Sequence, residues 1–586
     1  MTERKKVGPL ELRRTWEFAR AQNPNTRSPV LTKIFRCLLA LATLFLLTSP
    51  AQSEWFASVP PKPGDTAVAT AGSAPADSAL VLAWNLKGQI DIAGDLAKAR
   101  RVLQAGTDED IFQSLEHVLK RSPEEIFGYF SGAGYISLKE KSLSAETSPI
   151  VIVGLALEDS EGLSSWLQEM LAEERRAQID GFQLYLEQED DFTLGFDRQW
   201  LFFAFGKGSR SYALDAFKGD SPQLKTLVDF RQAFADLGYR ESGAAVYMKE
   251  SFYPSLLNLT ASVAGISSPE APPLWEYGAG AINFKTETGD LFLKLSGDSP
   301  AALALGAPGG VTGSFLKKVP NGLSSYLALD MAWYGNVLEA VTAEYAPLNS
   351  AYDYARTTLN SIGDVTDAFS GPVFIGSDLF DRLRPNSQRP TVLALAEIKN
   401  PDEAHRILLN LSQSEAIDQP SDTQDYETAQ GFKARLDRSH KELYVVYGPD
   451  SEDFLDEAAH HSGSPHALVE ETLDWSDGEL AILAFFDLEE FVEYWKSCEL
   501  PGEARITREF CREFLGHSRL QGVLAIKSGP EGVHYKLRGL ACSPLIPAAF
   551  IGAFTLSGIK AFSPPEALNS PATSEEADES QDLDQD

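Results

Sequence analysis

The chain has 586 residues, a formal net charge of −33 at pH 7 and 43% hydrophobic residues. This length and composition allow two to four domains with hydrophobic cores. The strongly acidic surface repels nucleic acid and anionic lipid headgroups, so we expect no nucleic-acid partner. Solubility, or adaptation to salty surroundings, would explain the excess of acidic residues.

Residues 1–53 have the pattern of a secretory signal peptide. They carry nine Lys/Arg and three Asp/Glu, and Lys33 and Arg36 precede a short apolar run at 37–48. Small residues at 51–53 offer a cleavage site before Glu54. Cleavage removes a net charge of 9 − 3 = +6 and leaves −39 on the exported part. The alternative is an uncleaved anchor, because the 17 uncharged residues at 37–53 are at the lower limit for a membrane helix.

Residues 54–74 are rich in Pro, Gly, Ala and Thr, which predicts a flexible linker. After it, the apolar run 150–157 predicts a strand buried on both faces. Apolar residues spaced by three and four predict a helix over 163–171. A second helix is predicted after Asn400, with Asn400 as its N-cap and Pro401 at its first position. In 182–186 and 192–196 large apolar residues occupy every second position, which predicts half-buried strands.

A hairpin is predicted near residue 290. The apolar segments 281–285 and 291–295 flank Thr288-Gly289-Asp290, a sequence typical of a tight turn. Together with the strands and helices before it, this hairpin predicts an α+β fold with a mainly antiparallel sheet and helices packed on it.

Three blocks of the sequence occur twice, which is the strongest signal of architecture. Phe192, Asp197 and Arg198 recur 240 residues later, at Phe432, Asp437 and Arg438, and Phe130-Ser131-Gly132 recurs as Phe369-Ser370-Gly371. A third block repeats at a spacing of 242 residues, with Gly280, Lys285, Lys294, Leu295 and Gly297 matching Gly522, Lys527, Lys536, Leu537 and Gly539. We therefore predict two tandem homologous lobes, 75–310 and 317–545.

Several segments of the first lobe resemble a known family. They are the opening strand Pro75-Ala76-Asp77-Ser78, the Phe130-Ser131-Gly132 block, the 150–157 strand with its helix, and the sequence 180–185. In these segments the chain resembles the bacterial exported proteins called domain of unknown function 3352 (DUF3352). The resemblance covers most of the first lobe and, more weakly, the second. It implies an exported location and no assigned activity, so it supplies no catalytic residues.

The segment 305–318 between the lobes contains two partial motifs. Its glycines suggest a phosphate-binding loop, but Gly313 is followed by Ser314 and Phe315 rather than by Lys and a hydroxyl residue. Ser314 and Lys317 make a Ser-x-x-Lys match of the kind found in some acyl-transfer enzymes, a spacing that is common by chance. We interpret the segment as a hinge.

Cysteines and histidines give few candidate sites. Outside the cytoplasm a Cys498–Cys511 disulfide is plausible and leaves Cys542 unpaired, whereas zinc binding lacks the required cysteine pairs. His460, His461 and His466 could ligate a metal, but a solvated loop is the better interpretation. The sequence thus predicts no cofactor site and no metal site.

The repeated Asp197-Arg198 and Asp437-Arg438 pairs are expected in a hairpin turn or at a strand end, as structural ion pairs. Catalysis by these pairs would require a third partner, and the sequence identifies none.

The C-terminal end contains an uncharged stretch between Arg538 and Lys560. Residues 546–562 are a possible membrane anchor, with a buried helix or an interfacial segment as the alternative. Residues 563–586 hold eight acidic and no basic residues, which predicts a disordered acidic tail.

These features predict an exported, non-enzymatic protein of the periplasm or cell envelope that binds or scaffolds an unknown partner. Two lobes would leave a cleft, a usual place for ligands. One alternative is an envelope hydrolase built from Ser314, Asp197 and the histidines at 460–466. Another is a carrier of an apolar ligand between the lobes, given the abundant Phe and Leu.

Overall fold

A computed structural model of the whole chain describes residues 66–542, with gaps. The predicted signal peptide, residues 54–65 of the linker, the apolar segment 546–562 and the acidic tail lie outside the described residues. Residues 67–72 of the predicted linker form a helix with buried Ala67 and Ala71, so this part is packed on the sheet rather than flexible. The gaps are 88–93, 95–96, 99, 103–115, 118, 141–148, 171–175, 187–191, 238–241, 256–272, 298, 320–322, 345–356, 358–367, 370, 378–391, 413–421, 428–430, 449–454, 456–464, 478–479, 498–503, 514 and 516–519.

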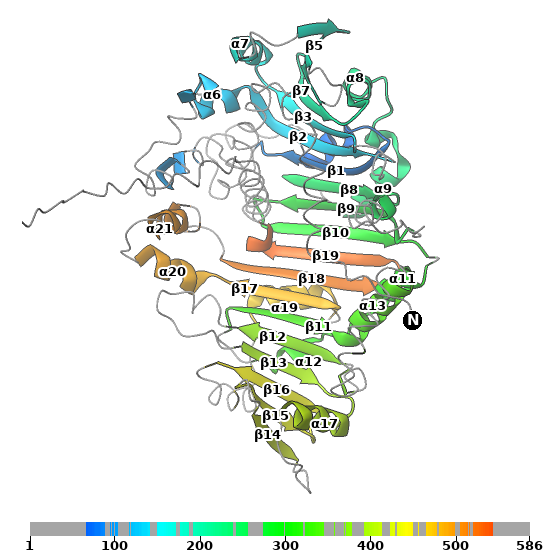
Figure 1. Cartoon of the computed structure of the whole chain (residues 1–586), viewed down its shortest axis with the longest axis vertical. Helices are drawn as coiled ribbons and strands as arrows, with labels where there is room; N and C mark the ends of the chain where they lie inside the picture. Colours follow the sequence, from blue (N-terminus) through cyan, green and yellow to red (C-terminus); the bar gives the residue numbers. More distant parts are fainter. Residues whose placement is uncertain are drawn as a thin grey trace, which may run out of the picture.

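Nineteen strands form one antiparallel sheet, which Figure 1 shows as a tall stack. In chain order the strands are β1 (Ser78–Asn85), β2 (Phe130–Lys139), β3 (Val151–Leu157), β4 (Arg176–Ile179), β5 (Phe182–Leu186), β6 (Phe192–Phe196), β7 (Trp200–Phe205), β8 (Ala244–Lys249), β9 (Trp275–Asn283), β10 (Thr288–Leu295), β11 (Ser325–Asp330), β12 (Pro372–Ser377), β13 (Val392–Glu397), β14 (Thr423–Glu427), β15 (Lys433–Asp437), β16 (Glu442–Tyr447), β17 (Ile482–Asp487), β18 (Gln521–Gly529) and β19 (Gly532–Gly539).

Helices flank this sheet on both faces. The described helices are α3 (Ala67–Gly72), α6 (Pro123–Gly128), α7 (Ser160–Met170), α8 (Ser209–Lys218), α9 (Val228–Leu237), α11 (Pro300–Leu305), α12 (Gly313–Leu316), α13 (Met331–Glu344), α17 (Pro401–Ser412), α19 (Ala467–Trp475), α20 (Glu489–Ser497) and α21 (Ala504–Glu513), with 3-10 turns η1 (Leu224–Thr226) and η2 (Leu540–Cys542). This arrangement confirms the predicted α+β class.

The strand order shows how the chain builds the sheet. From one edge to the other the order is β4-β5-β6-β7-β3-β2-β1-β8-β9-β10-β19-β18-β17-β11-β12-β13-β16-β15-β14. The run from β5 inward to β10 has the same connectivity as the run from β14 inward to β19. The two halves nevertheless share one sheet, so the prediction of two lobes with a sheet each is not confirmed.

The halves join where β10 pairs with β19. In this register Phe292 lies opposite His534, and their ring centroids are 4.4 Å apart. Phe292 and His534 are equivalent positions of the two halves, because they are 242 residues apart, the spacing of the third repeated block. The register is therefore symmetric about this pair, with Leu291 facing Tyr535 and Leu293 facing Val533. The junction is therefore a hydrogen-bonded ladder rather than the open cleft that the sequence suggested.

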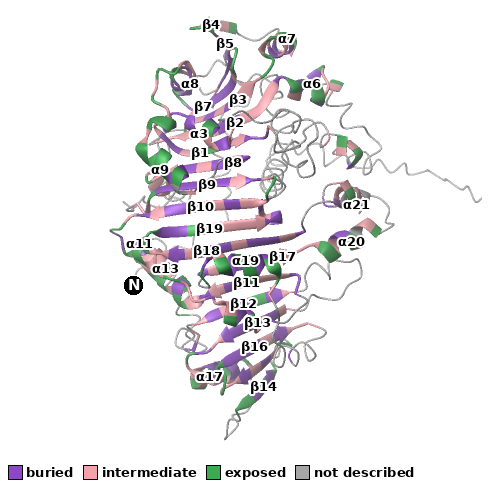
Figure 2. Cartoon of the chain, turned by 180° about the vertical axis from the view of Figure 1, so that it is seen from behind, coloured by how far each residue is buried: buried purple, intermediate pink, exposed green. Residues whose placement is uncertain are grey.

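One face of the sheet, here called the back face, carries Val81 on β1 and Ala328 on β11. In the first half, α3, α8 and α9 bury it, and in the second half α12 and α19 do so. Figure 2 shows α3, α9 and α19 lying over the strands on this side. These helices form the two largest clusters of buried side chains, so the main cores of both halves lie on the back face.

Two helices follow from the sequence as expected. In α7, Leu163, Trp166 and Leu167 are buried, and the Trp166 indole donates a hydrogen bond to the Leu119 carbonyl at 2.7 Å. In α17, the Asn400 side chain accepts a hydrogen bond from the Glu403 amide at 3.3 Å, as an N-cap does. Both predicted helices are confirmed.

The predicted turn at Thr288-Gly289-Asp290 is wrong by a few residues, because all three lie within β10. The chain reverses at 284–287 instead. There the Asn283 side chain accepts hydrogen bonds from the amides of Lys285 and Thr286, and Glu287 takes a left-handed conformation. An Asx-type bond and a positive φ at a non-glycine residue replace the expected glycine turn.

The predicted hinge at 305–318 is held against the sheet. Val311 and Leu480 exchange two backbone hydrogen bonds, at 2.9 and 3.1 Å. Gly309 runs so close to the backbone just before β17 that an added Cβ would meet the Leu480 carbonyl oxygen at 2.2 Å. The glycines of this segment thus allow close backbone approach rather than free rotation.

A candidate apolar binding face

The face opposite the back face, here called the front face, carries Leu82 on β1 and Leu327 on β11. Directly paired residues of an antiparallel sheet point to the same face, so cross-strand rows can be followed along it. One row contains one residue from each strand: Arg176, Tyr185, Leu194, Phe203, Val153, Ile136, Leu82, Val246, Gly280, Leu291, Tyr535, Ile526, Ile482, Leu329, Val373, Ala396, Leu443, Leu436 and Gln424.

This row has no charged residue after Arg176 at the edge. The neighbouring row runs from Gln178 to Tyr426 through Leu327 and Ile375, and it has none at all. An antiparallel sheet with a solvated face normally alternates apolar with polar residues. Here the two front-face rows stay apolar across most of the width of the sheet, whereas the back face carries charged residues such as Asp290 and Lys536.

Helices cover only parts of the front face. At one end α7 packs over β3, β6 and β7, and at the other α17 packs over β13, β15 and β16. In the middle, α11 and α13 pack with Leu293, Ile526 and Val533. Figure 1 shows α11 and α13 over the right-hand ends of the central strands.

Two patches of the front face stay accessible between these covers. On β1, Leu82 is 43% exposed, and on β11 and β12, Leu327 and Ile375 are 41% and 50% exposed. Contiguous exposed apolar patches mark interaction or ligand-binding sites, whereas single exposed hydrophobic residues are ordinary. The front face is therefore the candidate functional site.

Sequence reasoning did not single out these residues. The signal was present in β1, where Ala79 to Trp84 form an unbroken apolar run. In an antiparallel sheet such a run implies apolar groups on both faces.

The repeated Asp-Arg pairs lie at hairpin turns, as predicted. Asp197 ends the β6 side of the first turn, where its carboxylate accepts hydrogen bonds from the amides of Gln199 and Trp200, both at 2.7 Å. Asp437 holds the second turn in the same way, through the His440 amide at 3.0 Å and its ring Nδ1 at 2.8 Å. The carboxylates therefore stabilise turns.

Asp437 titrates abnormally because of these bonds. Burial alone would raise the pKa of Asp437, but the hydrogen bonds from His440 and Ser439 outweigh it and lower the pKa to about 2. The bond to Asp437 raises the pKa of His440 in turn. Arg438 pairs with Asp402 at the start of α17, at 2.5 Å, rather than with its neighbour Asp437. The predicted ion pair within each Asp-Arg sequence is thus replaced by turn capping.

Among the described residues, the candidates for the alternative hydrolase site lie in separate elements. Ser314 lies in α12, where its hydroxyl contacts that of Thr312 at 2.8 Å, and Asp197 lies at a turn of the other half. His466 caps α19 by accepting a hydrogen bond from the Leu468 amide, at 3.2 Å. His460 and His461 lie outside the described residues.

The cysteines are partly described. Cys511 and Cys542 are buried free thiols, and burial raises their pKa values to about 11 and about 12. Cys498 lies outside the described residues, so the Cys498–Cys511 disulfide stays a prediction.

An ionic cluster lies at the ends of β13 and β16. Lys318 Nζ contacts Glu397 at 2.9 Å and Glu442 at 2.7 Å, and the Tyr444 hydroxyl donates to Glu442 at 2.6 Å. Burial disfavours the charge on Lys318, but its bonds to Glu442 and Glu397 outweigh this and raise its pKa. In the first half the corresponding end pair, on β3 and β7, is Ala156 and Trp200. The cluster therefore belongs to the second half alone.

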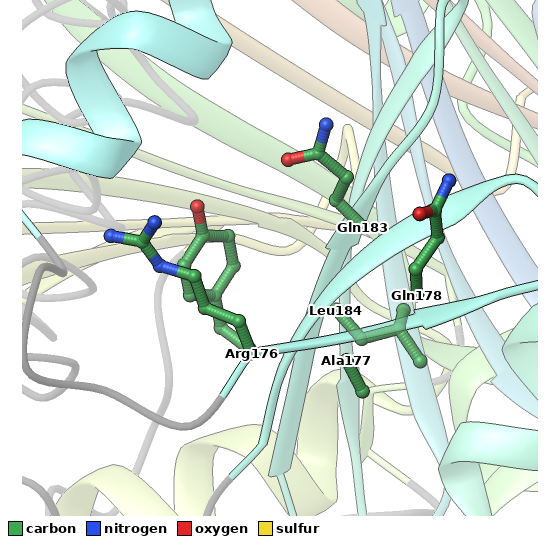
Figure 3. Close-up of a pocket in the computed structure, with 6 residues that line it drawn as sticks. Arg176, Ala177, Gln178, Gln183 and Leu184 are labelled. Atoms are coloured by element: carbon green, nitrogen blue, oxygen red, sulfur yellow. The ribbon is translucent and has the colours of Figure 1, made fainter.

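A small pocket of about 210 Å³ lies on the β4–β5 hairpin at the sheet edge, lined by residues that include Arg176, Gln178, Gln183 and Tyr185 (Figure 3). Drug-sized ligands usually occupy about 300–1,000 Å³, so this hollow is too small for one.

Within the described part of the chain, no three His, Cys, Asp or Glu residues cluster as metal ligands. None of the helices described has the length and apolarity needed to cross a membrane.

Comparisons with known proteins add little to this geometry. No family model and no curated protein matches the chain. Among solved structures, crystal form I of TP0453 is similar with a TM-score of 0.23 and 13% identity, over 39% of this chain and 78% of that one. Crystal form IV gives 0.24 and 11%, over 38% and 79%. At such TM-scores the similarity carries no argument about fold or function.

Proposed function

We propose that the chain is an exported, non-enzymatic protein of the cell envelope that binds an apolar ligand on the front face of its sheet. The export part rests on the signal pattern of residues 1–53 and on the resemblance to DUF3352. The observation that carries the binding part is the pair of cross-strand rows in which Arg176, at the edge, is the sole charged residue.

The chemistry of the face selects the class of ligand. Away from the polar edge at Arg176, the most exposed large side chains of the two rows are Leu82, Leu327 and Ile375, which offer no hydrogen-bond donor or acceptor. A hydrocarbon chain needs none, and it gains about 25 cal/mol for each Å² of apolar surface removed from water. An anionic headgroup is disfavoured by the net charge of −39 on the exported part, so an uncharged or zwitterionic lipid fits better.

We also infer that the sheet arose from two tandem homologous lobes, 75–310 and 317–545. The matching strand order of the two halves supports this, as do the three repeated sequence blocks. The symmetric register around Phe292 and His534 is the arrangement expected where two copies of one edge strand meet.

A neutral apolar fluorophore, N-phenyl-1-naphthylamine, tests the binding site. We expect the purified full chain to enhance its emission, and the Leu327→Glu/Ile375→Glu variant to lose about half of that enhancement, because charges enter the part of the face around Leu327 and leave the part around Leu82 intact. Val228→Glu is the matched control, since Val228 is 68% exposed and lies on α9, which packs on the back face. Equal emission from all three proteins, each with an unchanged melting temperature, would refute the proposed function.

A further inference from the structure

The two accessible patches of the front face have the same construction. In the first, Leu82 on β1 lies between Ile136 on β2 and Val246 on β8. In the second, Leu327 on β11 lies between Ile375 on β12 and Ala484 on β17. The central strand of each patch occupies the same place in the strand order of its half. We name them the Leu82 patch and the Leu327 patch.

The patches are separate surfaces. Six strands lie between β1 and β11, so at a strand spacing of about 4.8 Å the two leucines are about 34 Å apart along the sheet. Between them, α11 and α13 pack over the central strands. One hydrocarbon chain fills half of a bilayer core of about 30 Å, hence about 15 Å. A single chain cannot cover both patches.

We propose that the protein holds two apolar ligands, one hydrocarbon chain on the Leu82 patch and an equivalent one on the Leu327 patch. The inference rests on the proposed function, because it concerns the stoichiometry and position of the same ligand. Each patch contains one aliphatic residue from each of three adjacent strands. Across the strands it therefore spans two strand spacings, about 10 Å. That width suits a single lipid molecule.

Charge and hydrogen bonding favour a neutral lipid over two other occupants, a second copy of the chain and a polypeptide segment. A second copy of the exported chain would bring −39 against −39 as the faces approached, and this repulsion opposes face-to-face packing. A polypeptide segment would bring backbone N–H and C=O groups that need partners when buried. The aliphatic side chains of the patches supply none, whereas a hydrocarbon requires none.

The stoichiometry of N-phenyl-1-naphthylamine binding to the full chain tests the inference. We expect two sites per chain in the wild type, one in Leu82→Glu, one in Ile375→Glu, and none in the double variant. Val228→Glu, on α9, should keep two. Leu82→Gln and Ile375→Gln, which add no charge, serve as second variants if either glutamate lowers the melting temperature.

The outcomes separate the two proposals. Absence of wild-type binding would overturn the proposed function itself. One wild-type site, lost in only one single variant, would leave the proposed function standing and overturn the two-site inference. A concentration-dependent dimer by sedimentation, abolished by the same glutamates without any probe binding, would show a second copy as the occupant and overturn both.

Discussion

At the scale of single residues, the Lys318 cluster joins one ammonium group to two carboxylates. Lys318 holds Glu397 and Glu442 together at the paired ends of β13 and β16. Without the ammonium group, two carboxylates would face each other on adjacent strands. Like charges directly opposite on a sheet are destabilising. Removing one partner of a buried ion pair also leaves the other charge buried without compensation.

We predict that Lys318→Met lowers the free energy of unfolding by about 1–3 kcal/mol. This is less than the 3–5 kcal/mol of a fully buried pair, because the Lys318 side chain is 32% exposed, although that of Glu442 is only 12% exposed. Lys527→Met is the matched control, since Lys527 is 33% exposed but its partner Asp477 is 88% exposed. Exposed pairs contribute about 0–1 kcal/mol. Urea denaturation measures both, and equal losses would contradict the prediction.

At the scale of elements, the β18–β19 hairpin brings the two halves together. Gly532 starts β19 and faces β10 so closely that an added Cβ would meet a Phe292 ring carbon at 2.2 Å and the Leu293 carbonyl oxygen at 2.4 Å. The second contact is with backbone, which cannot move aside as a flexible side chain can. Glycine is therefore required where β19 approaches its neighbour.

Gly532→Ala should destabilise the protein by about 1–3 kcal/mol, the usual effect of overpacking. Gly529→Ala is the control, because Gly529 pairs with Gly532 in the same hairpin and has nothing within 4 Å of an added Cβ. We expect that control to stay within about 1 kcal/mol of the wild type. Thermal unfolding compares the two variants. If both alanines had the same effect, close packing at the β10–β19 junction would not be the cause.

Local elements were predictable from the sequence where one interaction dominates. The stripe Leu163, Trp166 and Leu167 defines α7 because helical spacing alone places these residues on the sheet. The turn after β9 was misplaced because it depends on the Asn283 side chain, which competes with the glycine signal at 289. Spacing identifies an element, but a side-chain bond to the backbone decides where it ends.

At the scale of the whole molecule, the single sheet was not predictable from the repeat. Repeated blocks indicate two similar units, but the pairing of β10 with β19 is a contact between residues 240 to 250 positions apart. Nothing in the local pattern distinguishes it from two separate sheets. The front face was missed for a related reason, since its uncharged rows exist only after strands from both halves are aligned side by side.

The apolar segment 546–562 bears on whether the protein is attached to a membrane. The described chain ends at η2, where Leu540 and Cys542 are buried. We predict that 1–53 is cleaved and that 546–562 holds the protein at a membrane, since the segment is uncharged except for Lys560. Packing of the segment on the protein itself is the alternative.

Cell fractionation tests this attachment with three chains. The wild type and a chain ending at Phe562, which lacks only the acidic tail, should require detergent for release. A chain ending at Ser543 should be released without it, and it keeps the buried residues of η2 that a truncation at Arg538 would remove. Wild-type protein in the detergent-free soluble fraction would rule out the anchor. The segment would then belong to the folded body, and apolar ligands would have to reach the front face from solution rather than from an adjacent bilayer.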